Sequence, residues 1–132
     1  MTSLIAKEGY PIIAAVFGAA AVFFIISLAA SGYTANIFRL LSLLALVFCV
    51  FCLYFFRDPE RQIPRNAGAL LAPADGTIID IREVQEPLYL KGPARRVSIF
   101  MSVFNVHVNR APADGVIEFL QYNQGRFISA FK

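Results

Sequence analysis

The chain of 132 residues has no tryptophan, two cysteines and a single histidine, His107. One histidine with scattered carboxylates gives no metal-ligand spacing, so we expect no metal site. The cysteines, Cys49 and Cys52, form a CxxC motif inside an uncharged apolar run. No polar neighbour there would stabilise a thiolate, and we interpret the pair as apolar helix residues rather than as a redox or zinc pair.

Charged residues are also scarce, at 16% of the chain against 58% hydrophobic residues. From Arg57 onward the chain has ten Lys/Arg and eight Asp/Glu, and the net charge is only +3. This mild bias is unlike the basic footprint of nucleic-acid-binding domains, so no nucleic-acid partner is expected.

Two long runs without charge stand in the first half, at residues 11–31 and 40–56. Each is about the length that spans a hydrocarbon core of roughly 30 Å as a helix. Turn-forming residues at 32–36 separate them, and Arg39 can reach the interface with its long side chain. The sequence therefore predicts a transmembrane helical hairpin over residues 11–56, after an N-terminal segment at 1–10.

Positive charge flanks the hairpin and predicts its topology. Lys7 precedes the first run, Arg57, Arg61 and Arg65 follow the second, and the connecting turn carries no charge. Because cytoplasmic flanks are enriched in Lys and Arg, both ends are expected in the cytoplasm, at the inner cell membrane. A cleaved signal peptide is the main alternative for the first run.

The second half is rich in strand and turn signals. Pro59 ends the second helix, residues 57–68 look like a linker, and residues 69–132 look like a mainly-β module. The predicted strands are 77–84, 95–102, 103–110, 115–122 and 126–131, with a loop at 85–94. Alternation along 103–110 would place His107 on a polar strand face. About five strands leave the sheet looking incomplete, so another chain or a further segment is expected to finish it.

One motif, Ala-Pro-Ala-Asp-Gly, occurs twice, at 72–76 and 111–115. Each copy precedes β-branched residues and is typical of a turn that launches a strand. Asp75 and Asp114 can therefore be turn aspartates that cap their own backbone. His107 can be a neutral, hydrogen-bonded imidazole or a catalytic base, and the second role needs a carboxylate and a nucleophile.

Four motifs in order resemble the short bacterial and archaeal form of phosphatidylserine decarboxylase: residues 56–61 (FRDPER), 73–76 (PADG), 98–102 (SIFMS) and 105–112 (NVHVNRAP). The resemblance runs from about residue 9 to 132. It implies a barrel-sandwich-like fold and a proenzyme that cleaves itself between a glycine and a serine. The products would be a β chain and an α chain whose first residue becomes a pyruvoyl group. That group would decarboxylate phosphatidylserine to phosphatidylethanolamine through a Schiff base.

The resemblance also assigns roles to residues. Asp75 matches the family's PADG aspartate, which orients or charges the self-cleavage base. His107 matches the first histidine of an H-x-x-H-x-P motif and is implied in proton transfer. Arg110 stands where long forms have a second histidine, and a guanidinium is no base near neutral pH, so whether His107 serves one step or both stays open.

The chain contains no Gly-Ser dipeptide. The expectation is therefore a β-chain portion that is inactive without an α-chain segment of the same proenzyme. A different class of function also remains, a membrane-tethered β-module that binds a partner without catalysis. Lys91 is a poor match to the lysine of biotin- or lipoate-carrying domains.

Substrate-binding residues are less clear from sequence. The stretch 88–96 mixes apolar and basic side chains, and beside an anionic membrane its members Leu88, Leu90, Arg95 and Arg96 are candidates for binding the phosphatidylserine headgroup. A homodimer is compatible with the sequence and is not required by it.

Overall fold

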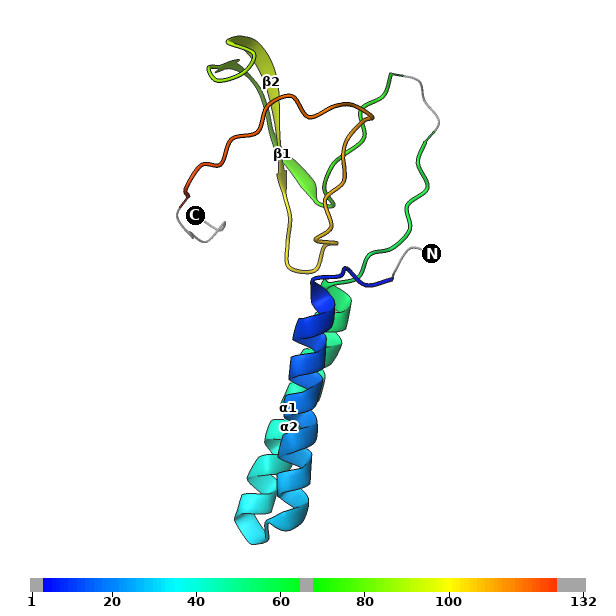
Figure 1. The fold of residues 1–132 in the computed structure, drawn as a ribbon, viewed down its shortest axis with the longest axis vertical. Coiled ribbons are helices and arrows are strands. Elements are labelled where there is room, and N and C mark those ends of the chain that lie inside the picture. The colour runs from blue at the N-terminus through cyan, green and yellow to red at the C-terminus, as the bar shows by residue number, and fades with distance from the viewer. Residues whose placement is uncertain (1–3, 65–67, 126–132) are drawn as a thin grey trace.

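The computed structural model describes residues 4–64 and 68–125, and it places a pair of long helices at one end of the molecule and a β-hairpin with irregular segments at the other (Figure 1). In chain order the elements are α1 (Gly9–Ala29), α2 (Gly32–Phe55), β1 (Thr77–Glu86) and β2 (Gly92–Phe100). The two predicted helices are confirmed. The predicted turn at 32–36 is wrong, since α2 already begins at Gly32 and only two residues connect the helices.

Small side chains line the contact between α1 and α2. The buried positions are Gly9, Ala20 and Ser27 on α1, and Ala35, Ser42, Cys49 and Cys52 on α2. The Ser42 hydroxyl donates a hydrogen bond to the Ala20 carbonyl at 2.9 Å, so the two backbones approach closely. Both cysteines are free and buried, which confirms their interpretation as helix residues.

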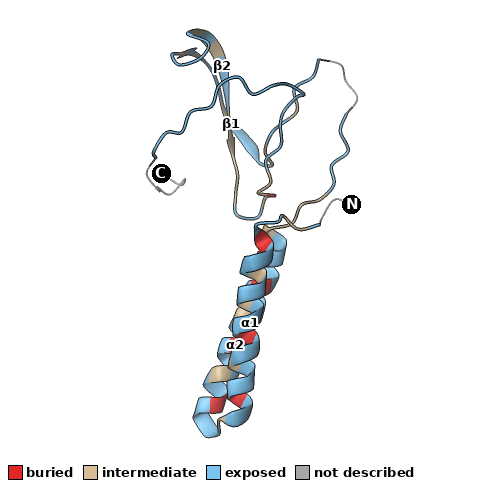
Figure 2. Cartoon of the chain, viewed as in Figure 1, coloured by how far each residue is buried: buried red, intermediate tan, exposed pale blue. Residues whose placement is uncertain are grey.

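The large aliphatic and aromatic side chains of both helices face outward, so most of each helix surface is exposed (Figure 2). Helices of a soluble protein bury such side chains, whereas helices in lipid expose them. By length and composition, both helices are sufficient to cross a membrane.

The β-hairpin is an antiparallel pair with a bulge between Ile78 and Asp80. Strands predicted at 77–84 and 95–102 are confirmed, but β1 extends to Glu86 and β2 starts at Gly92, so the loop is shorter than predicted. The Glu86 carboxylate closes this loop by accepting the backbone N–H groups of Leu88, Tyr89 and Leu90 at 2.8, 2.8 and 2.6 Å.

Two predicted strands are wrong. Residues 103–110 and 115–122 are irregular, and 126–131 lie outside the described residues. The first segment follows a tight turn, and the second has no partner strand among residues 68–125. β1 was also expected to be half-buried, yet Ile79 and Ile81 are 66% and 59% exposed. In the part of the chain that the structure describes, the sheet has two strands, and no barrel-sandwich is formed.

The N-terminal segment crosses the end of α2. The Ala6 N–H donates to the Phe56 carbonyl and the Asp58 N–H donates to the Leu4 carbonyl, both at 2.8 Å. These bonds fix residues 4–6 antiparallel to residues 56–58, so the start of α1 and the end of α2 meet at one junction.

Candidate active site

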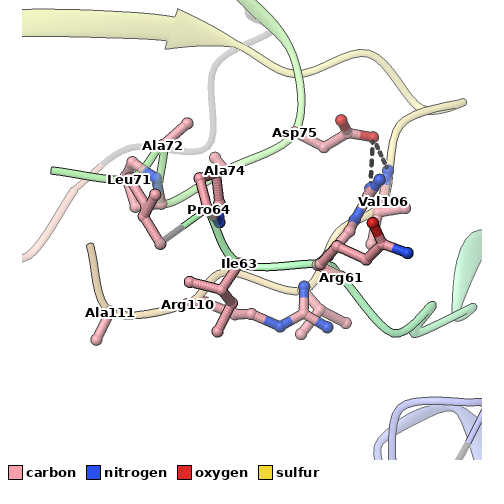
Figure 3. A pocket seen from close by; sticks show the side chains of 13 residues that line it. Arg61, Ile63, Pro64, Leu71, Ala72, Ala74, Asp75, Val106, Arg110 and Ala111 are labelled. Atoms are coloured by element: carbon pink, nitrogen blue, oxygen red, sulfur yellow. Dashed lines mark hydrogen bonds and ion pairs between the residues drawn. The ribbon is translucent and has the colours of Figure 1, made fainter. Parts of the chain in front are cut away.

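Asp75 is anchored to a segment 31 residues away in sequence. Its Oδ2 accepts the Val106 backbone N–H at 3.0 Å and lies 3.6 Å from the Arg61 guanidinium (Figure 3). The Val106 hydrogen bond, then Arg61, Asn105 and Arg57, lower the pKa of Asp75 against an opposing effect of desolvation. The carboxylate is therefore ionised at neutral pH.

The segment that receives Asp75 is a turn closed by Ser102 and Asn105. The Asn105 N–H donates to the Ser102 carbonyl at 3.0 Å, and the Asn105 Oδ1 accepts the Ser102 N–H at 2.8 Å. Asparagine and serine favour such local side-chain bonds over a strand ladder. This chemistry was visible in the sequence, and it outweighs the alternating pattern that predicted a strand.

His107 is held by the same turn. Its Nε2 lies 3.1 Å from the Ser102 carbonyl oxygen. A carbonyl only accepts, so Nε2 carries the hydrogen, and in the neutral ring Nδ1 keeps its lone pair. Within residues 4–64 and 68–125 the structure gives Nδ1 no hydrogen-bond partner. Nδ1 is thus the nitrogen of the only histidine that remains free to accept a hydrogen bond.

A ring of α2 supports the imidazole from one side. Phe55 and His107 stack with centroids 4.2 Å apart and planes 23° from parallel. The expected polar strand face for His107 is wrong, because the ring is positioned by the turn and by the last residue of α2.

Asp75 and His107 share the turn without touching each other, as far as the described residues show. Asp75 lines a cavity of about 290 Å³ with Arg61 and Arg110 (Figure 3). His107 lines another, of about 510 Å³. Val106, which is 2% exposed, donates its backbone N–H to Asp75 and directly precedes His107 in the chain. The carboxylate therefore orders the backbone beside the imidazole and does not bind the ring itself.

Arg57 connects α2 to the turn. Its guanidinium donates to the carbonyls of Tyr54 and Phe104, both at 2.7 Å, and lies 3.8 Å above the Tyr54 ring. The Tyr54 hydroxyl donates to the same Phe104 carbonyl at 3.1 Å. The sequence suggested a topological role for Arg57, with contact to anionic headgroups as the alternative. Nothing in the local pattern shows that Phe104 returns to the end of α2.

Arg110 is occupied in an ion pair. Its guanidinium bonds to the Asp58 carboxylate and reaches the Pro59 carbonyl at 3.3 Å. Its backbone N–H donates to the Pro73 carbonyl at 2.9 Å. Arg110 thus ties the turn that precedes Asp75 to the end of α2 and, consistent with its chemistry, serves as no base.

The two Pro-Ala-Asp-Gly copies differ in environment. Gly76 has φ +152°, and a Cβ there would lie 2.3 Å from the Phe100 carbonyl oxygen, so only glycine fits. A Cβ on Gly115 would meet nothing within 4 Å. The first copy is built into the junction with β2, and the second is an open turn.

The four predicted headgroup residues lie apart from this turn. Leu88 and Leu90 lie at the tip of the hairpin, which points away from the helices (Figure 1). These two residues are 48% and 61% exposed. Arg95 pairs with Glu83 at 2.8 Å and Arg96 with Asp80 at 3.7 Å. The ten residues of β1 separate the tip from Asp75. At the usual rise per residue, a strand of this length extends over roughly 30 Å.

Comparison with known proteins identifies relatives. A family model described as phosphatidylserine decarboxylase matches residues 48–132. Proteins named phosphatidylserine decarboxylase proenzyme are similar: 52% identity over 80 residues in Carboxydothermus hydrogenoformans, covering 61% of this chain and 38% of that protein. The protein from Magnetococcus marinus is 44% identical over 98% of this chain and 55% of its own length. That from Nitrosomonas europaea is 47% identical over 96% and 54%.

The chain spans between about a third and about half of the length of these relatives. No solved structure matches it.

Proposed function

The chain belongs to the phosphatidylserine decarboxylase family, and we propose that it is the β-chain portion of an enzyme that decarboxylates phosphatidylserine to phosphatidylethanolamine. The observation that supports this most is the turn at residues 102–107. It receives Asp75 from the first Pro-Ala-Asp-Gly copy and carries His107, which lines a cavity. A module that only binds a partner would need neither contact.

The proposed cofactor is a pyruvoyl group, which supplies a carbonyl that accepts electrons as carbon dioxide leaves. The residues around His107 fit such a group. The cavity has apolar walls from Phe55 and Phe56, and the imidazole of His107 is part of its lining. The 132 residues have no Gly-Ser dipeptide, so we propose that the serine comes from an α-chain segment of the same proenzyme.

His107 is the proposed proton-transfer residue. Its Nε2–H is fixed on the Ser102 carbonyl, so Nδ1 is the atom that takes up and returns a proton. The Phe55 ring limits rotation of the imidazole. With Arg110 bound to Asp58, His107 is the candidate for both self-cleavage and decarboxylation.

Asp75 acts in this proposal through the turn. Its charge holds the Val106 N–H, the neighbour of His107, and Arg61 lies 3.6 Å from the same carboxylate.

For the membrane, we propose that α1 and α2 span the inner cell membrane with both helix ends at Lys7 and Arg57 in the cytoplasm. The apolar helices, in which Arg39 is the one charged residue, and the basic flanks support this orientation. The turn at residues 102–107 would then lie at the cytoplasmic surface, within reach of anionic phospholipid headgroups.

Exposed apolar side chains support a further partner for the sheet. Ile79 and Ile81 on β1 are exposed, as are Val116, Ile117 and Leu120 at 83–90%. An isolated two-stranded hairpin is marginally stable, and such residues are normally covered. We propose that the α-chain segment covers them.

Co-expression tests the proposal. The 132 residues are expressed alone and joined to a downstream segment from a relative that contains Gly-Ser, and lipid extracts are assayed for phosphatidylethanolamine. We expect product only from the joined chain, and none when His107→Ala is introduced. Product formed by the 132 residues alone would contradict the requirement for the segment, and an inactive joined chain that has cleaved itself would contradict the activity.

A further inference from the structure

The cavity beside His107 lies where the helix pair meets the rest of the molecule. Its lining comes from the segment before α1, from the end of α2 and from the residues after the turn: Ala6, Lys7, Glu8, Phe55, Phe56, Asp58, His107 and Val108. At about 510 Å³ it has the size of a small-ligand site. Three parts of the chain that are distant in sequence build it.

Two residues in this lining carry opposite charges, and neither charge is paired within the described chain. Lys7 and Glu8 have no ion-pair partner among residues 4–64 and 68–125, whereas Asp58 is bound to Arg110. A cavity with one free cation and one free carboxylate does not fit a simple anion. It fits a ligand that carries both a negative and a positive group.

The position of Lys7 is fixed by backbone bonds. Ala6 donates to Phe56 at 2.8 Å, Gly9 donates to Ala6 at 2.9 Å, and a Cβ on Gly9 would lie 2.6 Å from the Phe56 side chain. Residues 6–9 are therefore held in a tight turn against the end of α2. The lysine is presented to the cavity by this turn.

The apolar part of the cavity lining comes from the end of α2. Phe55 is the last residue of α2 and Phe56 follows it, and the outward side chains of α2 are those of a lipid-facing helix. A phospholipid whose acyl chains run beside α2 would bring its headgroup to this level, next to His107.

We propose that this cavity is the headgroup subsite, with Lys7 bound to the phosphodiester and Glu8 facing the ammonium group of an aminophospholipid. The inference rests on the proposed function and adds to it the residues that select the substrate. It moves headgroup recognition from the hairpin tip to the junction of α1 and α2.

Chemical footprinting tests the proposal without turnover. The full proenzyme is placed in nanodiscs of phosphatidylcholine with phosphatidylserine or with phosphatidylglycerol, which is anionic and lacks the amine. Acetylation of Lys7 and Lys91 by an N-hydroxysuccinimide ester is followed by mass spectrometry before one-tenth of the lipid is converted. Phosphatidylserine should slow Lys7 acetylation about threefold or more relative to phosphatidylglycerol. A threefold change corresponds to less free energy than one charged hydrogen bond contributes. Lys91, on the hairpin loop, should not respond.

Kinetics give the second readout. Lys7→Ala should raise KM for phosphatidylserine by about tenfold, the effect of losing one charge-assisted hydrogen bond, with kcat nearly unchanged. Lys7→Arg should recover most of the loss, Glu8→Gln should raise KM, and Lys91→Ala should match the native enzyme.

Equal protection of Lys7 by both anionic lipids would overturn the subsite, because surface charge alone would then explain it. An unchanged KM for Lys7→Ala would overturn it as well. A proenzyme that shows phosphatidylserine-dependent protection and no decarboxylation would instead contradict the proposed function and leave the subsite standing.

Discussion

The imidazole of His107 lies almost parallel to the phenyl ring of Phe55, with centroids 4.2 Å apart, while its Nε2 faces the Ser102 carbonyl at 3.1 Å. One contact comes from the last residue of α2 and the other from the turn. The orientation of the basic Nδ1 therefore depends on the junction between the helix pair and the turn.

Phe55→Leu should misplace the imidazole. Leucine keeps an apolar side chain but loses the ring stack, which contributes about 0.5–1.5 kcal/mol. We expect decarboxylation by the full proenzyme to fall about fivefold, the rate equivalent of about 1 kcal/mol. Phe48→Leu, on the same helix and away from His107, is the control. Equal rates for the two variants would show that the stack does not position His107.

Arg57→Lys should loosen the turn. A lysine lacks the planar fork whose two terminal nitrogens donate separately to the Tyr54 and Phe104 carbonyls, so the connection between α2 and the turn is weakened. We expect faster hydrogen exchange at the Asn105 and Val106 amides. Arg82→Lys, in an exposed pair with Asp80, should leave these amides unchanged. Unaltered exchange in Arg57→Lys would mean that other contacts hold the turn.

Gly76→Ala should destabilise the chain by about 1–3 kcal/mol, because its Cβ would collide with the Phe100 carbonyl in a backbone conformation that alanine avoids. Gly115→Ala is the matched control in the second copy of the motif, where a Cβ meets nothing. Denaturant unfolding in detergent micelles measures both. Similar losses in the two variants would contradict the difference between the copies.

Asp75→Asn should weaken folding in a pH-dependent way. The lowered pKa means that the ionised group stabilises the fold above its unfolded value of about 3.9, and that this contribution is lost as the pH falls through the folded value. With 37% of the side chain exposed, we expect a loss under about 1 kcal/mol at neutral pH. The native chain and the variant should converge once the pH has fallen below the folded pKa of Asp75.

Asp114→Asn is the control for this measurement and should match the native chain at both pH values. A difference between native chain and Asp75→Asn that persists in acid would show that the charge of Asp75 is not what stabilises the turn.

The helix topology can be tested by labelling. With Cys49 and Cys52 replaced by alanine, Tyr33→Cys in the first turn of α2 should react with a membrane-impermeant maleimide on intact cells. Arg61→Cys should react only after permeabilisation, since the basic flanks face the cytoplasm. Reaction of Arg61→Cys on intact cells would reverse the proposed orientation.

The sequence by itself determined the two helices and the β-hairpin, and it identified the candidate reactive residues. Uncharged runs of this length have few alternatives to a helix, and the period-two pattern of 77–84 required a strand, because both signals depend on neighbours in the chain. Asp75 and His107 were found from residue type and motif, although their roles remain predictions.

Only the tertiary structure decided how these residues meet. Residues 103–110 carry an alternating pattern, but Ser102 and Asn105 close a turn that brings Val106 to Asp75 and His107 to Phe55. The positions of Lys7 and Arg57 were equally hidden, since each depends on a contact across about 50 residues. Local propensity cannot report such contacts, because their free energy comes from groups that the sequence places far apart.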